Sequence, residues 1–238
     1  MAEPLKNRYS SGFIERLTRE IESVYPKFAS DRFTSDVFDE NWGDKELKDR
    51  MGHIAQNLHK HLPKTFGQAV DILKQAIPRF DQGFEIMFFP DFVERYGMDE
   101  YELSIDALEY FTPYASSEFA VRPFIQRYPK RMMTQMKRWA GSENENVRRL
   151  ATEGCRPRLP WAMALPQFKK DPAPVMRILE MLKADPSEYV RRSVANNLND
   201  ISKDNPAIVI QIAKSWIGRS PETDWMVKHA CRTLLKAG

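Results

Sequence analysis

Three similar segments, spaced about 40 residues apart, constrain the fold of this chain more than any other feature. They read NVRRLATEG from Asn146, YVRRSVANN from Tyr189 and, more loosely, MVKHACRTL from Met226, so the copies are offset by 43 and 37 residues. Pairs of helices repeated at such a period are typical of HEAT-type arrays, in which each pair buries its apolar stripe against its neighbours. We therefore expect an all-α solenoid of HEAT-like repeats, with the second helix of each pair lining a basic concave face.

Apolar residues recur every three to four positions along the chain, which is the period of an α-helix, and no segment shows the alternation typical of a strand. Capping residues, prolines and glycines mark the expected helix ends. The expected starts are Asp44, a capping box from Ser142 to Glu145, Asp185, Asn205 with Pro206, and Ser220 with Pro221, and the expected ends include Gly141 and Gly218. We expect a single domain over residues 1–238, with N-terminal helices in 1–115 and the repeats in 116–238.

The composition excludes several classes of protein. Cys155 and Cys231 are the only cysteines and lie far apart, so neither a disulfide framework nor a zinc site is expected. His59 and His61 lack the spacing and the companions of metal ligands. Nowhere do roughly 18 apolar residues run together, and the N-terminus has no apolar signal region. We therefore expect a cytoplasmic protein with no bound metal and no membrane segment.

The net charge of +3 conceals two blocks of opposite sign. Residues 81–118 contain ten acids and one base, whereas residues 119–170 contain twelve bases, Arg122 among them, and three acids. The blocks either face each other, or the basic block forms the positive surface of a protein that binds a polyanion. In the second case, Arg122 and the bases that follow it would extend that surface.

The second helices of the repeats combine arginine pairs with acids. The residues outside their apolar stripes include Arg148, Arg149, Glu153, Arg191, Arg192 and Asp200. Guanidinium groups bind phosphate through paired hydrogen bonds, and each neutralised phosphate releases a counterion, so the arginine pairs suit a phosphate backbone. The alternative is that each pair forms salt bridges with acids of the next repeat.

The acids indicate a cationic substrate, because carboxylates close to DNA phosphates would otherwise weaken binding. A base alkylated on a ring nitrogen is positively charged, and the deoxyribose becomes oxocarbenium-like as that base leaves, so a carboxylate stabilises the transition state. In the segment EGCRPRLPWA, Pro157 and Pro160 stiffen the chain and present Arg156, Arg158 and Trp161 in fixed directions. Trp161 would offer a flat wall to a cation or a sugar, the alternative being a core tryptophan.

Three segments resemble a known family. They are VRRLATEGCRPRLPWA from Val147 to Ala162, YVRRSVANNLNDISKDNP from Tyr189 to Pro206, and SSEFAVRPFI from Ser116 to Ile125. They resemble the bacterial HEAT-like repeat DNA glycosylases for alkylated bases, of the AlkC and AlkD type, and those of the AlkC type more closely. The N-terminal half shares only a general helical character with them.

The resemblance implies an activity and a set of site residues. The family excises cationic N-alkylated bases such as 3-methyladenine from double-stranded DNA without flipping the lesion into a pocket, and the AlkC-like branch also acts on 3-methylcytosine and 1-methyladenine. It implies no metal and no small cofactor. The implied catalytic residues are Asp200, Glu153, Trp161 and Glu118, and the implied DNA contacts are Arg148, Arg149, Arg156, Arg158, Arg191 and Arg192.

Two other functions remain open at this point. One is a non-catalytic HEAT-type scaffold that grips a protein partner, and the other is a DNA-binding repeat protein that senses lesions without cleaving the glycosidic bond. In both, Glu153 and Asp200 would be contact or helix-end charges only. We expect a monomer in each case.

Overall fold

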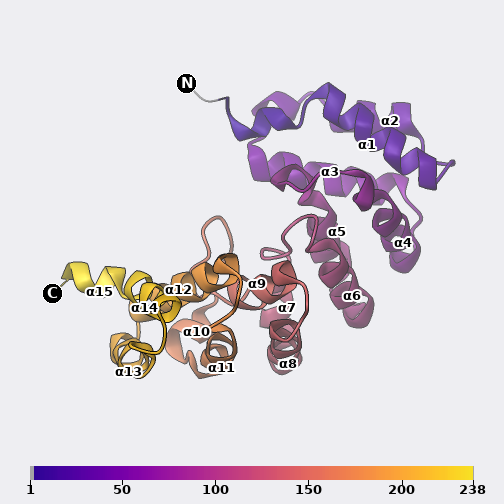
Figure 1. Ribbon diagram of the computed structural model, residues 1–238. Helices are drawn as coiled ribbons and strands as arrows, with labels where there is room; N and C mark the ends of the chain where they lie inside the picture. Colours follow the sequence, from indigo (N-terminus) through magenta and orange to yellow (C-terminus); the bar gives the residue numbers. More distant parts are fainter. Residues whose placement is uncertain (1–2, 238) are drawn as a thin grey trace. The chain divides into compact units, whose positions relative to one another are not determined.

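The computed structural model describes residues 3–237, which contain helices and no strand (Figure 1). The predicted all-α class is therefore confirmed. The chain forms two compact units, one ending at Ala120 and the other beginning at Val121. The boundary predicted between residues 115 and 116 lies shortly before this division, and the single domain over residues 1–238 stays a prediction.

The N-terminal unit packs short helices around an aromatic core. Its α-helices are α1 (Ser11–Val24), α2 (Ser30–Val37), α3 (Leu47–His61), α4 (Phe66–Ala76), α5 (Phe88–Tyr96) and α6 (Tyr101–Phe111), and 3-10 turns occupy Leu5–Arg8, Trp42–Asp44, Ile77–Arg79 and Phe84–Ile86. Phe88, Phe89 and Phe92 of α5 are completely buried. Helix α5 packs against both α3 and α6, so its aromatic rings form the centre of this unit.

The C-terminal unit contains the repeats. Its helices are α7 (Val121–Arg127), α8 (Pro129–Ala140), α9 (Glu145–Glu153), α10 (Pro166–Lys170), α11 (Ala173–Leu182), α12 (Glu188–Ser202), α13 (Pro206–Trp216), α14 (Pro221–Ala230) and α15 (Arg232–Ala237). The pairs α8/α9, α11/α12 and α13/α14 each pack together, and the second helices α9, α12 and α14 also lie side by side (Figure 1). The predicted repeat of helix pairs is confirmed.

Two predicted capping residues of the repeats are wrong by the same amount. The N-caps of α9 and α12 are Asn144 and Ser187, two residues after the predicted Ser142 and Asp185. The side chains of Ser142 and Asp185 instead accept hydrogen bonds from the backbone amides of Asn144 (3.2 Å) and Ser187 (2.9 Å). They therefore shape the turn before the helix, a role that serine and aspartate also favour.

Among the remaining predicted helix ends, one is wrong and the others are confirmed. Asp44 is not the N-cap of α3, because Glu46 caps that helix in a capping box with Asp49. Asn205 and Ser220 precede α13 and α14 as predicted, and the Ser220 side chain accepts a hydrogen bond from the amide of Thr223. Gly141 ends α8, and Gly218, with φ of 79°, follows α13 in the left-handed region that favours glycine. 

No helix within residues 3–237 is long and apolar enough to cross a membrane. No group of three or more histidine, cysteine or acidic side chains in the same range is arranged to hold a metal ion.

Candidate active site

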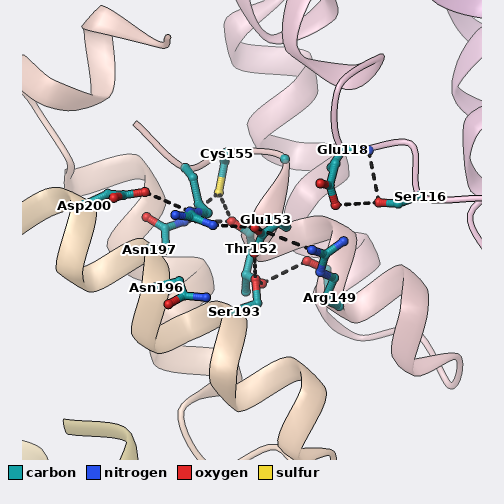
Figure 2. Close-up of polar contacts among 12 residues, drawn as sticks. Ser116, Glu118, Arg149, Thr152, Glu153, Cys155, Ser193, Asn196, Asn197 and Asp200 are labelled. Carbon is teal, nitrogen blue, oxygen red and sulfur yellow. Dashed lines mark hydrogen bonds and ion pairs between the residues drawn. The ribbon is translucent and has the colours of Figure 1, made fainter. Parts of the chain in front are cut away.

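Two buried carboxylates lie close together on the second helices of adjacent repeats. Glu153 is the last residue of α9, and Asp200 lies near the end of α12, which packs beside α9 (Figure 2). Their side chains are only 6% and 4% exposed. We call Glu153 and Asp200 the acid pair.

One guanidinium group joins the two carboxylates of the acid pair. Arg156 follows α9 and donates from Nη1 to Glu153 Oε1 at 2.5 Å and from Nε to Asp200 Oδ2 at 2.8 Å. Burial lowers the pKa of Arg156, but attraction to Glu153 and Asp200 outweighs burial and the pKa is raised overall. The acid pair therefore shares a cation that remains charged.

Further contacts fix each member of the acid pair. The Ser193 hydroxyl donates to Glu153 Oε2 at 2.5 Å, and the Thr152 hydroxyl donates to Ser193 Oγ, also at 2.5 Å (Figure 2). Lys203 donates from Nζ to Asp200 Oδ1 at 3.1 Å, and its side chain is 37% exposed. Glu153 is thus held by buried groups, whereas one oxygen of Asp200 is covered by a lysine that reaches solvent.

The segment after α9 presents Trp161 in an unusual backbone conformation. The amide of Ala162 donates to the carbonyl of Leu159 at 3.3 Å, which closes a turn with Pro160 and Trp161 in its central positions. Trp161 has φ of 62°. Proline followed by a residue with positive φ is typical of a type II turn, in which glycine usually takes the position that Trp161 occupies here. A left-handed backbone costs a non-glycine residue roughly 1–2 kcal/mol.

Trp161 is not a core tryptophan. It is 70% exposed, the largest exposed fraction among the exposed large hydrophobic residues of this structure. Leu159 and Leu165 on either side of the turn are buried, and the amide of Leu165 donates to the carbonyl of Pro157 at 3.1 Å. A closed, anchored loop therefore holds a strained and solvent-exposed indole, and strained residues of this kind cluster at functional sites.

The first arginine of each Val-Arg-Arg segment binds the turn before its own helix. Arg148 donates from Nη1 to the carbonyls of Ser142 and Glu143, and Arg191 donates in the same way to those of Asp185 and Pro186. Arg148 also forms a two-bond salt bridge with Asp185 of the next repeat, at 2.6 and 3.0 Å. The alternative of salt bridges between repeats therefore holds for Arg148.

The second arginines and Arg158 lie in more open settings. Arg149 is 3.5 Å from Glu153 Oε1 and stacks over the ring of Tyr189. Arg192 pairs with Glu188 of its own helix, and both side chains are 59% exposed. Arg158 pairs with Asp204 at 2.7 Å and is partly exposed. Arg158 and Arg192 therefore retain access to solvent, and Arg149 lies next to the acid pair.

Glu118 belongs to the N-terminal unit. Its carboxylate accepts a hydrogen bond from the Ser116 hydroxyl at 2.7 Å, and Ser116 Oγ also accepts from the Glu118 amide at 3.4 Å (Figure 2). The side chain is held locally and is neither buried nor fully exposed. Its predicted participation in one site with the acid pair stays a prediction.

Comparison with known proteins places the chain in a family. A family model described as "DNA alkylation repair enzyme" matches residues 95–234, which is more than half of the chain. The chain belongs to this family. The resemblance seen in the sequence is thereby confirmed.

Two proteins are similar to this chain over nearly all of its length. It is 48% identical over 234 residues to "Uncharacterized protein YhaZ" of Bacillus subtilis (strain 168), a match that covers 98% of this chain and 65% of the relative. Pseudomonas fluorescens alkylpurine DNA glycosylase AlkC, solved bound to DNA containing an abasic site analog, has a TM-score of 0.95 at 38% identity over 99% of this chain and 66% of that one. The chain thus spans slightly less than two thirds of the length of each.

Two residues around the acid pair were not predicted as parts of a site. Thr152 was expected outside the apolar stripe but was given no role, and Ser193 was not predicted, although it takes the place in the second copy that Leu150 has in the first. A hydroxyl at an apolar position of a repeat was the available signal. Arg122, predicted to extend the positive surface, is completely buried, so that prediction is wrong.

Proposed function

We propose that this chain hydrolyses the N-glycosidic bond of cationic N-alkylated bases in double-stranded DNA. 3-Methyladenine is the principal substrate in this proposal, and 3-methylcytosine and 1-methyladenine are further ones. The observation that carries the proposal is a buried acid pair held by Arg156, in the same basic unit as a rigidly presented, exposed tryptophan. Membership of the DNA alkylation repair family and the likeness to AlkC support it.

The chemistry requires stabilisation of positive charge on the sugar. The bond between C1′ and the base nitrogen breaks, and its electron pair leaves with the base, which thereby loses its positive charge. The sugar becomes oxocarbenium-like until the oxygen of a water molecule bonds to C1′ and the water releases a proton. A carboxylate beside C1′ stabilises this cation, orients the water by accepting a hydrogen bond from it, and takes up the proton that the water releases.

We assign the main part in this reaction to Asp200. Arg156 holds Asp200 Oδ2, whereas Oδ1 is covered by the partly exposed Lys203. A DNA phosphate competes for the Lys203 ammonium, and movement of Lys203 toward it leaves Oδ1 available to the sugar. Glu153 lines the side of the lesion in this proposal, and Trp161 packs on the deoxyribose, while the part of Glu118 stays a prediction.

The six arginines predicted as DNA contacts divide into two groups in this proposal. Arg149, Arg158 and Arg192 bind phosphates, because their side chains are exposed or lie beside the acid pair. The other three, Arg148, Arg156 and Arg191, hold the turns and the acid pair through bonds within the chain. Their contribution to DNA binding is therefore indirect.

We further propose that the reaction proceeds without base flipping, as the family resemblance implies, and that the protein acts as a monomer. The leaving group already has a positive charge, so its departure needs no pocket that protonates the base. The reaction needs only water as co-reactant. A non-catalytic scaffold is the second candidate, because the bonds of Arg156 to the acid pair would also serve a purely structural role.

Release of free base from methylated duplex DNA tests the proposal. The wild-type protein is expected to release 3-methyladenine, and Asp200→Asn is expected to slow single-turnover release about 100-fold, since one stabilising group at a developing charge contributes roughly 3 kcal/mol. Glu180→Gln changes an exposed carboxylate on α11 and is the matched control. Absence of release by folded wild-type protein would favour the scaffold.

A further inference from the structure

Arg122 of α7 is a buried cation without a carboxylate partner. It is completely buried, no ion pair among residues 3–237 includes it, and its Nη2 has no hydrogen-bond partner in that range. Its partners are backbone carbonyls: Nε donates to Met163 O at 2.7 Å, and Nη1 donates to Gly154 O at 3.0 Å. Buried charges in proteins are usually paired with an opposite charge, so a buried arginine that binds only carbonyls calls for a reason.

The two carbonyls lie at opposite ends of the segment that carries Trp161. Gly154 directly follows Glu153 at the end of α9, and Met163 lies two residues beyond Trp161. We call residues 154–165 the Trp161 loop. The buried Arg122 side chain therefore joins Gly154, at the start of the Trp161 loop, to Met163, which follows the indole.

The backbone of the Trp161 loop needs such a restraint. Trp161 occupies a turn position that favours glycine, and a strained conformation persists only where the surrounding structure determines it. The hydrogen bond from the amide of Leu165 to the carbonyl of Pro157 closes the base of the loop. Arg122 supplies a side-chain hydrogen bond to the carbonyl of Met163, two residues beyond Trp161.

Only arginine suits this position among the basic side chains. Its planar fork directs several donors at once, whereas lysine has a single ammonium on a flexible stem. Burial lowers the pKa of Arg122 to about 10, while Asp200 and Glu153 oppose the shift, so the group remains protonated at neutral pH.

We propose that Arg122 is a positioning residue that fixes the direction of the Trp161 indole and, through Gly154, the end of α9 at Glu153. This inference rests on the proposed function, in which the indole packs on the deoxyribose. Arg122 itself touches neither DNA nor the reacting atoms. It acts on the rate of base release and leaves affinity for undamaged DNA unchanged.

The test compares Arg122→Lys with wild type in protein labelled with 5-fluorotryptophan. The ¹⁹F resonance of Trp161, assigned by its loss in Trp161→Phe, is expected to shift or broaden, while the resonances of the other tryptophans stay in place. Single-turnover release of 3-methyladenine is expected to fall by roughly 10- to 100-fold, since small misplacements have effects of that size. Affinity for undamaged duplex is expected to change less than about 2-fold. Arg177→Lys, an exposed arginine on α11, is the matched control.

A double-mutant cycle separates positioning of Trp161 from a general structural role. If Arg122 acts through the indole, Arg122→Lys slows release much less in a Trp161→Ala background than in wild type. If Arg122→Lys does not fold, Arg122→Gln, which keeps one amide donor, replaces it throughout. An unchanged resonance together with an unchanged rate overturns the inference. If wild type releases no base, the proposed function fails, but the fluorine spectra still show whether Arg122 orients Trp161.

Discussion

Helices α9 and α12 both contain a Val-Arg-Arg segment. The first arginine makes the same backbone contacts in both helices, whereas the second arginine makes different contacts. Arg148 and Arg191, 43 residues apart, each bind two carbonyls of the preceding turn, so the first position does the same work in both copies. Arg149 and Arg192 differ, because Arg149 lies beside Glu153 whereas Arg192 is exposed and pairs with Glu188. The first arginine of the segment therefore stabilises the fold, whereas the contacts of the second arginine depend on whether its repeat contributes to the candidate site.

The acids of the two copies also differ. Glu153 of α9 corresponds to Asn196 of α12, and the acid that α12 contributes, Asp200, lies about one helical turn later. The two carboxylates therefore come from unequal positions of the repeat and meet only because Arg156 reaches both. The acid pair therefore lies at positions where the two copies differ in sequence, while the arginine contacts that hold the turns are the same in both copies.

Arg148→Ala is expected to have the largest effect on stability. The Asp185 side chain is 3% exposed, and removal of Arg148 leaves this buried carboxylate without its cation, which costs about 3–5 kcal/mol of unfolding free energy. Urea denaturation measures the loss. Arg149→Ala is the control in the same helix, and its loss is expected to be smaller because Glu153 keeps Arg156. Equal losses would contradict the distinction between the two positions.

Arg191→Ala is expected to lose less than Arg148→Ala. Arg191 binds the carbonyls of Asp185 and Pro186, and loss of such bonds costs about 1–3 kcal/mol. The same denaturation experiment gives the value. A loss as large as that of Arg148→Ala would show that the carbonyl bonds, rather than the salt bridge to Asp185, stabilise the turns.

Substitutions of Trp161 compare strain with activity. Because φ is 62° at this position, Trp161→Gly is expected to be more stable than Trp161→Ala by about 1 kcal/mol, the reverse of the usual order of these residues. Thermal unfolding measures the difference. Both variants are expected to release 3-methyladenine more slowly than wild type, so relief of strain would not restore activity. A more stable alanine variant would show that the turn is not strained.

The smallest expected effect is that of Arg192→Ala on the salt dependence of DNA binding. Arg192→Ala is expected to flatten the slope of log affinity against log salt by about 0.9, the value for one phosphate contact. Arg191→Ala in the same helix is expected to leave the slope unchanged, since its guanidinium binds the preceding turn. If Arg191→Ala flattens the slope as much as Arg192→Ala, the prediction made from sequence, in which both arginines bind DNA directly, is restored.

The sequence predicted those features that depend on local periodicity. The all-α class and the repeat of helix pairs follow from apolar spacing, and Ser220 and Gly141 mark helix ends because their effects are confined to a few residues. The prediction failed for Ser142 and Asp185 because the contacts that decide their position lie outside the four residues of a capping box. Arginines six positions later bind the carbonyls of Ser142 and Asp185, so these two residues lie in the turn and the helix begins later.

The site was predicted only in part for the same reason. The spacing of Glu153 and Asp200 on second helices brought both into consideration, but no local rule shows that Arg156 would join them. Arg122 looks like a surface charge in sequence, and only the path of the Trp161 loop explains its burial. The positive φ of Trp161 was equally hidden, because glycine rather than tryptophan signals such a turn.

A crystal structure with duplex DNA that contains an abasic-site mimic tests the central claim most directly. In this complex, Lys203 is expected to move away from Asp200 toward a phosphate, and Asp200 Oδ1 to lie within about 3.5 Å of the C1′ position of the mimic. Trp161 is expected to pack on the same sugar. A complex in which Asp200 keeps both Arg156 and Lys203 and lies far from the abasic sugar would contradict the claim.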